Sequence, residues 1–237
     1  MKKISIFMSL FYYSMTLMAT ELSVISVIGN AYDIEKGEKI SSENLIIKPI
    51  TISVSKNSRI MLKDEENSLF FHIGSGSLIT LTPHKVFIDR GLMLIGSSDN
   101  KLSLKISSFS SSTSITGSGF MFIEGLENDG LKLIGLSGKI RVGLESKNQG
   151  ILAPGQVHFI SPNLEEFGTS VNIDLLKFCK SSLLITGFEE SISTHLDDLN
   201  KAARHQRKKI KKRFNAIVGG MNQPNSFEVI VIEPDKD

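Results

Sequence analysis

A regular succession of short apolar runs, each cut by turn-forming residues, dominates the chain from Leu22 to Pro162. Within the runs Ile, Val, Leu and Phe alternate with polar residues, while Gly, Ser, Asn and Asp separate one run from the next. Alternation with a period of two is typical of half-buried strands, and many short strands spaced by about ten residues are typical of sandwiches, barrels and solenoids. No amphipathic helical run interrupts the region, so a parallel sheet with helical crossovers is not expected.

The predicted strands are Leu45–Ile47, Ile50–Val54, Ile60–Leu62, Leu69–Ile73, Leu78–Leu81, Lys85–Ile88, Leu92–Ile95, Leu102–Ile106, Phe120–Ile123, Leu131–Leu136 and Lys139–Val142. The clearest turn sequences between and after them are Asp89–Gly91, Ser98–Asn100, Glu127–Gly130 and Pro154–Gly155, because these residue types favour tight turns. The sequence therefore predicts a mainly β fold.

The first 19 residues have the order of a secretory signal peptide. Lys2 and Lys3 form a short positive region, Ile4–Met18 is apolar, and Ala19 is a plausible cleavage position. We expect an extracytoplasmic protein, periplasmic or secreted, with an uncleaved N-terminal membrane anchor as the alternative. Removing the segment with its two lysines reduces the 27 basic residues to 25, equal to the 25 acidic residues. A mature chain without net charge is not expected to bind nucleic acid.

The period of the apolar residues changes to a helical one from Phe188 to about Val218, within a C-terminal extension that we place at 164–237. The stripe with spacings of three and four consists of Ile192, Leu196, Leu199, Ala203, Gln206, Ile210, Phe214 and Ile217, with Gln206 as its one polar interruption. Gly219 and Gly220 are a suitable helix stop. A short terminal strand is predicted from Phe227 to Ile232. One long amphipathic helix and this strand therefore follow the β domain.

The segment Lys201–Arg213 carries eight basic residues and no acid. One interpretation is an anion-binding face, with Lys208, Lys209, Lys211 and Lys212 as its residues, which would also provide membrane contact. The other is an ordinary solvated helix face beside the apolar stripe. We prefer the solvated face, because a helix that docks through its stripe needs a polar outer surface.

No catalytic or metal-binding constellation stands out. The single cysteine, Cys179, excludes a disulfide framework and multi-cysteine metal sites. The histidines lack the close spacings of a metal site, and His72, between Phe71 and Ile73, is expected to point outward. Two strands would have to bring His72 and His158 together for a histidine pair to form, which we do not expect. The sequence predicts no cofactor, no metal and no enzyme.

Several short motifs occur in the order and at the approximate spacing of one family. They are Ser58–Leu62, the Gly-Ser turn Ile73–Ser77, Gly91, Ile115–Phe120, Leu136–Val142 and Leu152–Gln156. On these motifs the span from about Leu22 to Asn163 resembles the FecR domain, an extracytoplasmic β-rich module of bacteria. The resemblance implies a stacked, solenoid-like or jellyroll β domain, which we place at residues 20–163.

The resemblance also points to a set of signature residues, namely Gly91, Gly117, Gly119, Phe120, Gly138, Pro154 and Gly155. We interpret them as structural, since glycine permits a positive φ or a close approach between stacked strands. A phosphate-binding loop would need a longer glycine pattern that leads into a helix, which the sequence lacks.

The function expected from the resemblance is a non-catalytic binding or scaffold module, in cell-envelope signalling or surface-ligand recognition. Its partner would be another envelope protein or a surface polymer. Some family members relay signals to sigma factors through a cytoplasmic segment, but only Met1–Lys3 precede the apolar run, so a sigma-factor partner is not expected. The alternatives are a β-solenoid enzyme acting on polysaccharide and a binder of lipopolysaccharide with an open apolar groove. Neither the ligand nor the oligomeric state follows from the sequence.

Overall fold

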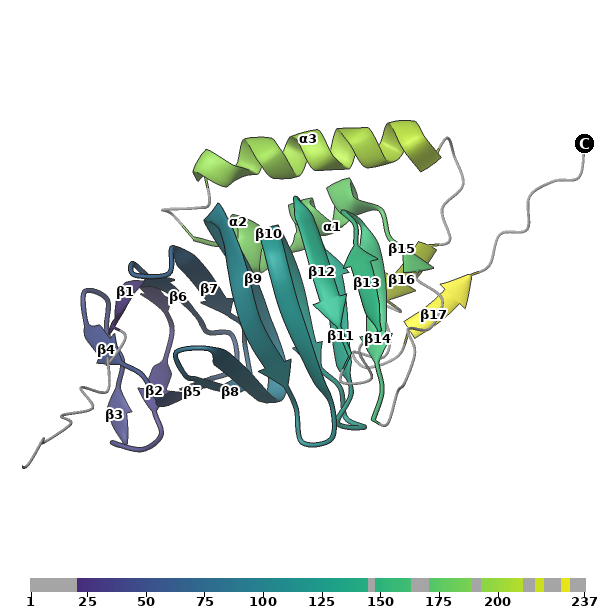
Figure 1. Ribbon diagram of the computed structural model, residues 1–237. Coiled ribbons are helices and arrows are strands. Elements are labelled where there is room, and N and C mark those ends of the chain that lie inside the picture. Colours follow the sequence, from purple (N-terminus) through teal and green to yellow (C-terminus); the bar gives the residue numbers. More distant parts are fainter. Residues whose placement is uncertain are drawn as a thin grey trace, which may run out of the picture.

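The computed structural model describes residues 21–144, 148–162, 171–188, 193–210, 216–219 and 227–230 (Figure 1). The strands are β1 (Glu21–Ile28), β2 (Ala31–Asp33), β3 (Glu38–Lys39), β4 (Leu45–Ile47), β5 (Ile50–Val54), β6 (Arg59–Asp64), β7 (Leu69–Ile73), β8 (Leu78–Leu81), β9 (Lys85–Ser107), β10 (Ser112–Gly125), β11 (Leu131–Gly135), β12 (Lys139–Gly143), β13 (Gln149–Leu152), β14 (Gln156–Ile160), β15 (Val171–Asn172), β16 (Ala216–Gly219) and β17 (Phe227–Ile230). The helices are α1 (Leu175–Ser181), α2 (Leu183–Thr186) and α3 (Ser193–Ile210).

Fifteen strands form one sheet that branches on both sides of the long β9–β10 hairpin. β9 pairs with β8 through its first residues and with β7 through residues 93–97. β10 pairs with β12 through residues 114–118 and with β11 through residues 121–125. All described strand pairs are antiparallel. The hairpin therefore belongs to two layers of the sheet, and each layer continues along its own branch.

The two layers enclose an apolar interior, which we call the inner core. It takes alternate residues from every major strand, among them Ile52 of β5, Leu62 of β6, Phe71 of β7 and Ile123 of β10, all nearly or fully buried. Successive residues of a strand point to opposite faces, so the alternation in the sequence directly supplies this core. Branched aliphatic side chains dominate it, in agreement with their preference for strands.

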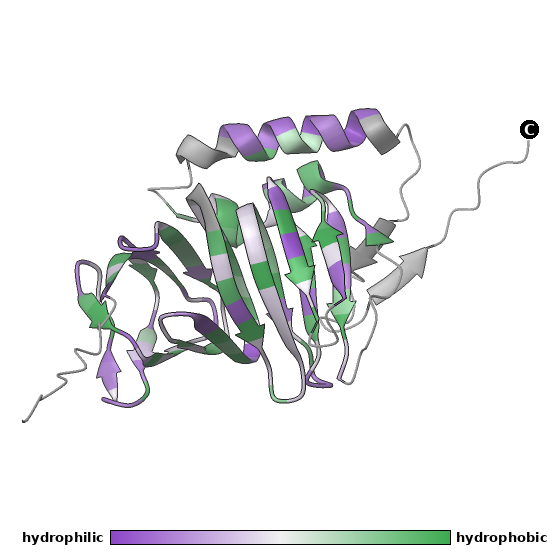
Figure 2. Ribbon diagram, in the orientation of Figure 1, coloured by the Kyte–Doolittle hydropathy of each residue, from purple (hydrophilic) through white to green (hydrophobic). Residues whose placement is uncertain are grey.

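A second apolar cluster lies on the outer face of one layer, under the helices, and we call it the helix-side cluster. Its sheet residues include Leu94 of β9, Phe120 of β10 and Ile134 of β11, and α3 contributes Leu199 and Ala203. In Figure 1 α3 runs across this end of the sheet, with α1 and α2 between it and the strands. Figure 2 shows α3 as largely hydrophilic, which fits a helix that docks through a narrow stripe.

The inner core also encloses an ion pair between Lys48 and Asp64. The Nζ and Oδ2 atoms lie 2.6 Å apart, both side chains are fully buried, and Nζ lies 5.4 Å from the centroid of the Phe71 ring. The Oδ2 atom also accepts a hydrogen bond from the Asn67 side chain. Burial raises the pKa of Asp64, but the hydrogen bonds from Lys48 and Asn67 outweigh this effect and leave the pKa lowered.

The mainly β fold and the C-terminal helix are confirmed, while the solenoid-like or jellyroll stacking remains a prediction. Two predicted turns are wrong, because β9 continues through both Asp89–Gly91 and Ser98–Asn100. At the first of them Gly91 adopts a φ of +91°, and the pairing partner of β9 changes there from β8 to β7. A positive φ at one glycine thus bends the strand without ending it.

The predicted helix is too long at its C-terminal end. α3 ends at Ile210, and Ile217, expected on the stripe, lies in β16. β17 pairs with β16. The short helices α1 and α2 were not predicted, because seven and four residues are too few for an apolar period to show. Within the described residues no helix has the length and apolar character needed to cross a membrane; the predicted signal segment, 1–19, lies outside them.

Candidate ligand groove

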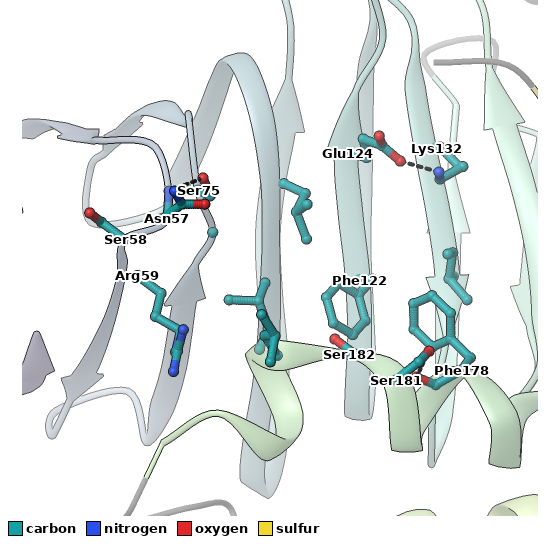
Figure 3. A pocket seen from close by; sticks show the side chains of 15 residues that line it. Asn57, Ser58, Arg59, Ser75, Phe122, Glu124, Lys132, Phe178, Ser181 and Ser182 are labelled. Carbon is teal, nitrogen blue, oxygen red and sulfur yellow. Dashed lines mark hydrogen bonds and ion pairs between the residues drawn. The ribbon is translucent and has the colours of Figure 1, made fainter. Parts of the chain in front are cut away.

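A groove of about 440 Å³ lies on the helix side of the sheet, where the helical layer ends (Figure 3). Its floor consists of Leu92 of β9, Phe122 and Glu124 of β10, and Lys132 and Ile134 of β11. These side chains share a face because Glu124 is paired with both Leu92 and Lys132, and Phe122 is paired with Ile134. The floor therefore changes from apolar under the helices to charged at the open end.

The helices α1 and α2 provide one wall. Phe178 of α1 packs edge-on against Phe122, with ring centroids 5.0 Å apart. Leu184 of α2 is buried, whereas its neighbour Leu183 lines the groove and is 63% exposed. A large exposed aliphatic side chain beside an apolar groove extends the surface available to a ligand.

The opposite end of the groove is formed by the β5–β6 turn, which contains Asn57, and the β7–β8 turn, which contains Ser75. Asn57 adopts a φ of +57°, and its backbone N–H donates to Oγ of Ser75 over 2.8 Å. The next residues, Ser58 and Arg59, also line the groove. In Figure 3 this polar end faces the Glu124–Lys132 pair across the apolar floor. The groove thus has an apolar floor between two polar ends, and its helical wall also carries the hydroxyl groups of Ser181 and Ser182.

Two side chains from the sheet fix the α2 segment in place. Nε and Nη2 of Arg59 donate to the carbonyl oxygen of Gly187 over 2.9 and 2.6 Å. Nδ1 of His72 lies 2.7 Å from the carbonyl oxygen of Leu184 and must donate to it, because a carbonyl only accepts. The ring of Phe188 packs against both, 5.6 Å from the Arg59 guanidinium and 5.0 Å from the His72 ring.

His72 corrects a prediction from the sequence. Its side chain points away from the inner core as expected, but the α2 segment covers it and only 1% remains exposed. Burial lowers the pKa of His72 to about 4, so the ring is neutral at neutral pH. His158 is paired with Leu133, an inner-core residue, so the two histidines lie on opposite faces and form no pair.

The charges of the groove are unevenly compensated. Lys132 forms an ion pair with Glu124, and its side chain is only 10% exposed. Arg59 contacts a backbone carbonyl and an aromatic ring, and among the described residues it forms no ion pair. Among the described residues that line the groove, Arg59 is therefore the one charged side chain without an opposite charge beside it, at the end formed by the turns.

The signature glycines gather where β10 passes from one layer to the other. Gly117 and Gly119 have φ values of +122° and +113°, and the register shifts between them. A Cβ at Gly119 would collide with the carbonyl oxygen of Ser137, and one at Gly138 with that of Ser118. The backbones of β10 and the β11–β12 turn therefore touch, and only glycine fits at these positions.

The other signature residues are Phe120 beside this corner, Pro154 and Gly155 in another turn, and Gly91 at the bend of β9, where it pairs with Gly125. Phe120 covers Gly96, its cross-strand partner, and belongs to the helix-side cluster. Pro154 and Gly155 form the β13–β14 turn, where Gly155 has a φ of +80° and its N–H donates to the carbonyl of Gly135 over 2.8 Å. None of the signature residues lines the groove, so sequence reasoning identified the sheet corners and missed the groove.

Gln206, the polar interruption of the predicted stripe, is a buried anchor. Its Nε2 donates to the carbonyl oxygen of Ile173 over 2.8 Å, and its Oε1 accepts from the N–H of Leu175 over 3.2 Å. A Cβ at Gly155 would collide with its amide group. Gln206 therefore joins α3 to the start of α1 and to the β13–β14 turn.

Of the four predicted anion-binding residues, the structure describes the side chain of one. Lys208 lies on α3 and is exposed. Lys209 lies on α3 without a described side chain, and Lys211 and Lys212 lie outside the described residues. Nearby, Arg207 forms an ion pair with Asp174, the N-cap residue of α1, over 3.0 Å.

Metal-binding side chains do not gather in the described part of the chain. It contains no cluster of three or more His, Cys, Asp or Glu residues that would hold a metal. Burial raises the pKa of the Cys179 thiol to about 12, which leaves it unreactive at neutral pH.

Comparison with known proteins finds only distant structural similarity. No family model matches the chain, and no curated protein matches it. Two crystal structures of a protein from Parabacteroides distasonis ATCC 8503, provisionally described as an anti-sigma factor, align with a TM-score of 0.41 each. Their identities are 14% and 13%, and each alignment covers 52% of this chain and 59% of the other. Similarity of this degree assigns no function.

Proposed function

We propose that the protein is an extracytoplasmic, non-catalytic binding module of FecR type, and that its ligand occupies the groove. The observation that carries the proposal is that the described helices leave Leu92, Phe122 and Ile134 as an apolar floor between two polar ends. A concave apolar site of about 300–1,000 Å³ with a few polar groups is the usual form of a small-ligand site.

Binding without catalysis is favoured by the chemistry of the groove. Its carboxylate, Glu124, is neutralised by Lys132, and the nearby His72 ring is covered by the α2 segment. Hydrolysis of a glycosidic bond would require two carboxylates facing each other across the substrate. Glu124 is the single carboxylate among the described residues that line this groove.

The FecR assignment rests on the order of the sequence motifs. It is supported by the convergence of Gly117, Gly119 and Gly138 on one corner of the sheet, where each is required by its φ and by close backbone contact. In this proposal the module acts in cell-envelope signalling or surface-ligand recognition, with another envelope protein or a surface polymer as partner.

The groove is tested with the neutral fluorescent probe 1-N-phenylnaphthylamine. We expect saturable binding at one site, and loss of binding in Ser182→Trp, because Ser182 lines the groove without a side-chain hydrogen bond to α2. Ser41→Trp is the matched control, since Ser41 is exposed in a loop outside the groove. Equal binding by both variants would exclude the groove as the site.

The location is tested separately by mass spectrometry of the extracytoplasmic fraction. A mature N-terminus near Thr20 is expected from the signal sequence. Recovery of the full-length chain from membranes would instead support the N-terminal anchor.

A further inference from the structure

We infer that the groove binds a free single-chain amphiphile with one anionic head group, and that Arg59 receives this head group. The inference rests on the proposed function, because it names the ligand class of the same groove. It follows from three features of the groove, which are the apolar floor, the uncompensated charge and the preorganised guanidinium.

The apolar part of the groove suits a hydrocarbon chain. Phe122 and Ile134 form the floor there, and Phe178 and Leu183 form the apolar part of a wall that also contains Ser181 and Ser182. The apolar side chains among them offer a lining without hydrogen-bonding groups, so a ligand gains chiefly from the removal of apolar surface from water. A flexible chain matches such a lining better than a polar sugar, whose hydroxyl groups would lose their hydrogen bonds to water.

The two charged ends of the groove are not equivalent. At one end Glu124 already neutralises Lys132, so a ligand anion there would have to displace a carboxylate. At the other end Arg59 has no carboxylate partner among the described residues. Charge complementarity therefore places an anionic head group beside Arg59.

The Arg59 guanidinium is held ready for an anion. Two of its five N–H groups face the carbonyl oxygen of Gly187, and its plane lies near the ring of Phe188. No described residue accepts a hydrogen bond from its remaining donors, which can form charge-assisted hydrogen bonds with a carboxylate or a phosphate ester. Because the side chain is already fixed by Gly187 and Phe188, little conformational freedom is lost when the ligand binds.

The groove favours a free amphiphile over a lipid within a bilayer. It is a recess between α1, α2 and the sheet, with a volume of about 440 Å³. A bilayer surface meets proteins through amphipathic helices or flat basic patches, and a single recessed arginine provides neither.

The experiment compares three probes with the same twelve-carbon chain, namely laurate, dodecanol and dodecyltrimethylammonium, on the full mature chain. We expect laurate to bind about tenfold more tightly than dodecanol and the cation to bind weakest, with higher salt weakening laurate alone. Equal affinity for laurate and dodecanol would refute the inference. Arg59-dependent sedimentation with anionic vesicles, without laurate binding, would also refute it.

Variants then locate the head group. Arg59→Gln is expected to lose the preference for laurate while it still binds dodecanol, which shows that the wall is intact. Lys63→Gln is the control, because this half-exposed lysine lies outside the groove and should leave both affinities unchanged. If Arg59→Gln binds neither probe, the salt dependence of the unmodified protein decides, and a salt-independent laurate affinity overturns the inference. If laurate binds no more tightly than dodecanol while phenylnaphthylamine still binds, the inference of an anionic head group at Arg59 is refuted. The proposed function is not affected by that result.

Discussion

The inner core and the helix-side cluster bury similar side chains but are held together differently. In the inner core two sheet layers meet through aliphatic residues whose positions follow from strand alternation, such as Ile52 and Leu62. In the helix-side cluster, short helices must be placed on a sheet face by particular polar contacts, chiefly those of Arg59, His72 and Gln206. Apolar residues supply most of the contacts in the first region, with the buried Lys48–Asp64 pair as a polar exception, whereas the second depends on several single polar side chains.

One of the two largest effects is expected at the corner that holds the two layers in register. In Gly119→Val the new side chain meets the carbonyl of Ser137 at a φ of +113°, so we expect a loss of about 4 kcal/mol in unfolding free energy. Urea denaturation measures the loss. Gly76→Val is the control, because Gly76 also has a positive φ, +72°, but has open space around it. This variant should lose only the free energy that a side chain costs at a positive φ. Equal losses in both variants would show that backbone contact at the corner does not matter.

Truncation of one leucine in each region compares them directly. Leu62→Ala in the inner core should cost about 4 kcal/mol and destabilise the whole domain, and Leu199→Ala on α3 about 3 kcal/mol. Hydrogen exchange should show that Leu199→Ala releases the helices before the sheet opens. Lys208→Gln on the exposed face of α3 should change stability by less than about 0.5 kcal/mol. Uniform loss of protection in Leu199→Ala would make the two regions one cooperative unit.

Acidification should weaken the helix-side cluster through His72. Its pKa is lowered from 6.5 to about 4, so the unfolded chain binds the proton first and stability falls as pH decreases from 6.5 to 4. The shift corresponds to about 3 kcal/mol, lost across this window in urea titrations.

The variant His72→Gln cannot titrate and should lose most of this pH dependence. A smaller slope should remain, because burial also lowers the pKa of His158. The exposed His205 provides the control, and His205→Gln should behave as the unmodified protein does. A full slope in His72→Gln would place the titrating group elsewhere.

Gln206 tests whether a polar anchor is needed at all. Gln206→Met keeps the length of the side chain but leaves the N–H of Leu175 and the carbonyl of Ile173 without their partner, which should cost about 2 kcal/mol. Thermal unfolding measures the change. A Gln206→Met protein as stable as the original would mean that the helix-side cluster does not need this polar anchor.

The two regions also differ in how far the sequence predicts them. Alternation located the strands of the inner core, and the glycine motifs located its corners. The same alternation made His72 an outward residue, because a period of two cannot show whether a helix covers the outer face. Gln206 interrupted an apolar stripe, and only the structure shows that its amide satisfies the backbone at the start of α1. The groove joins residues from Asn57 to Leu184, a separation that no local pattern encodes.

The β9–β10 hairpin has a consequence for how the chain folds. Only residues 108–111 separate its strands, so the loop is quickly closed, while its register determines where both layers begin. We expect the hairpin to be formed in the folding transition state, so that Ile115→Val slows refolding while Leu199→Ala mainly accelerates unfolding. Stopped-flow kinetics measure both rates, and normal refolding of Ile115→Val would contradict this order. The helices and the groove would then be the last parts to assemble, on a sheet that has already formed.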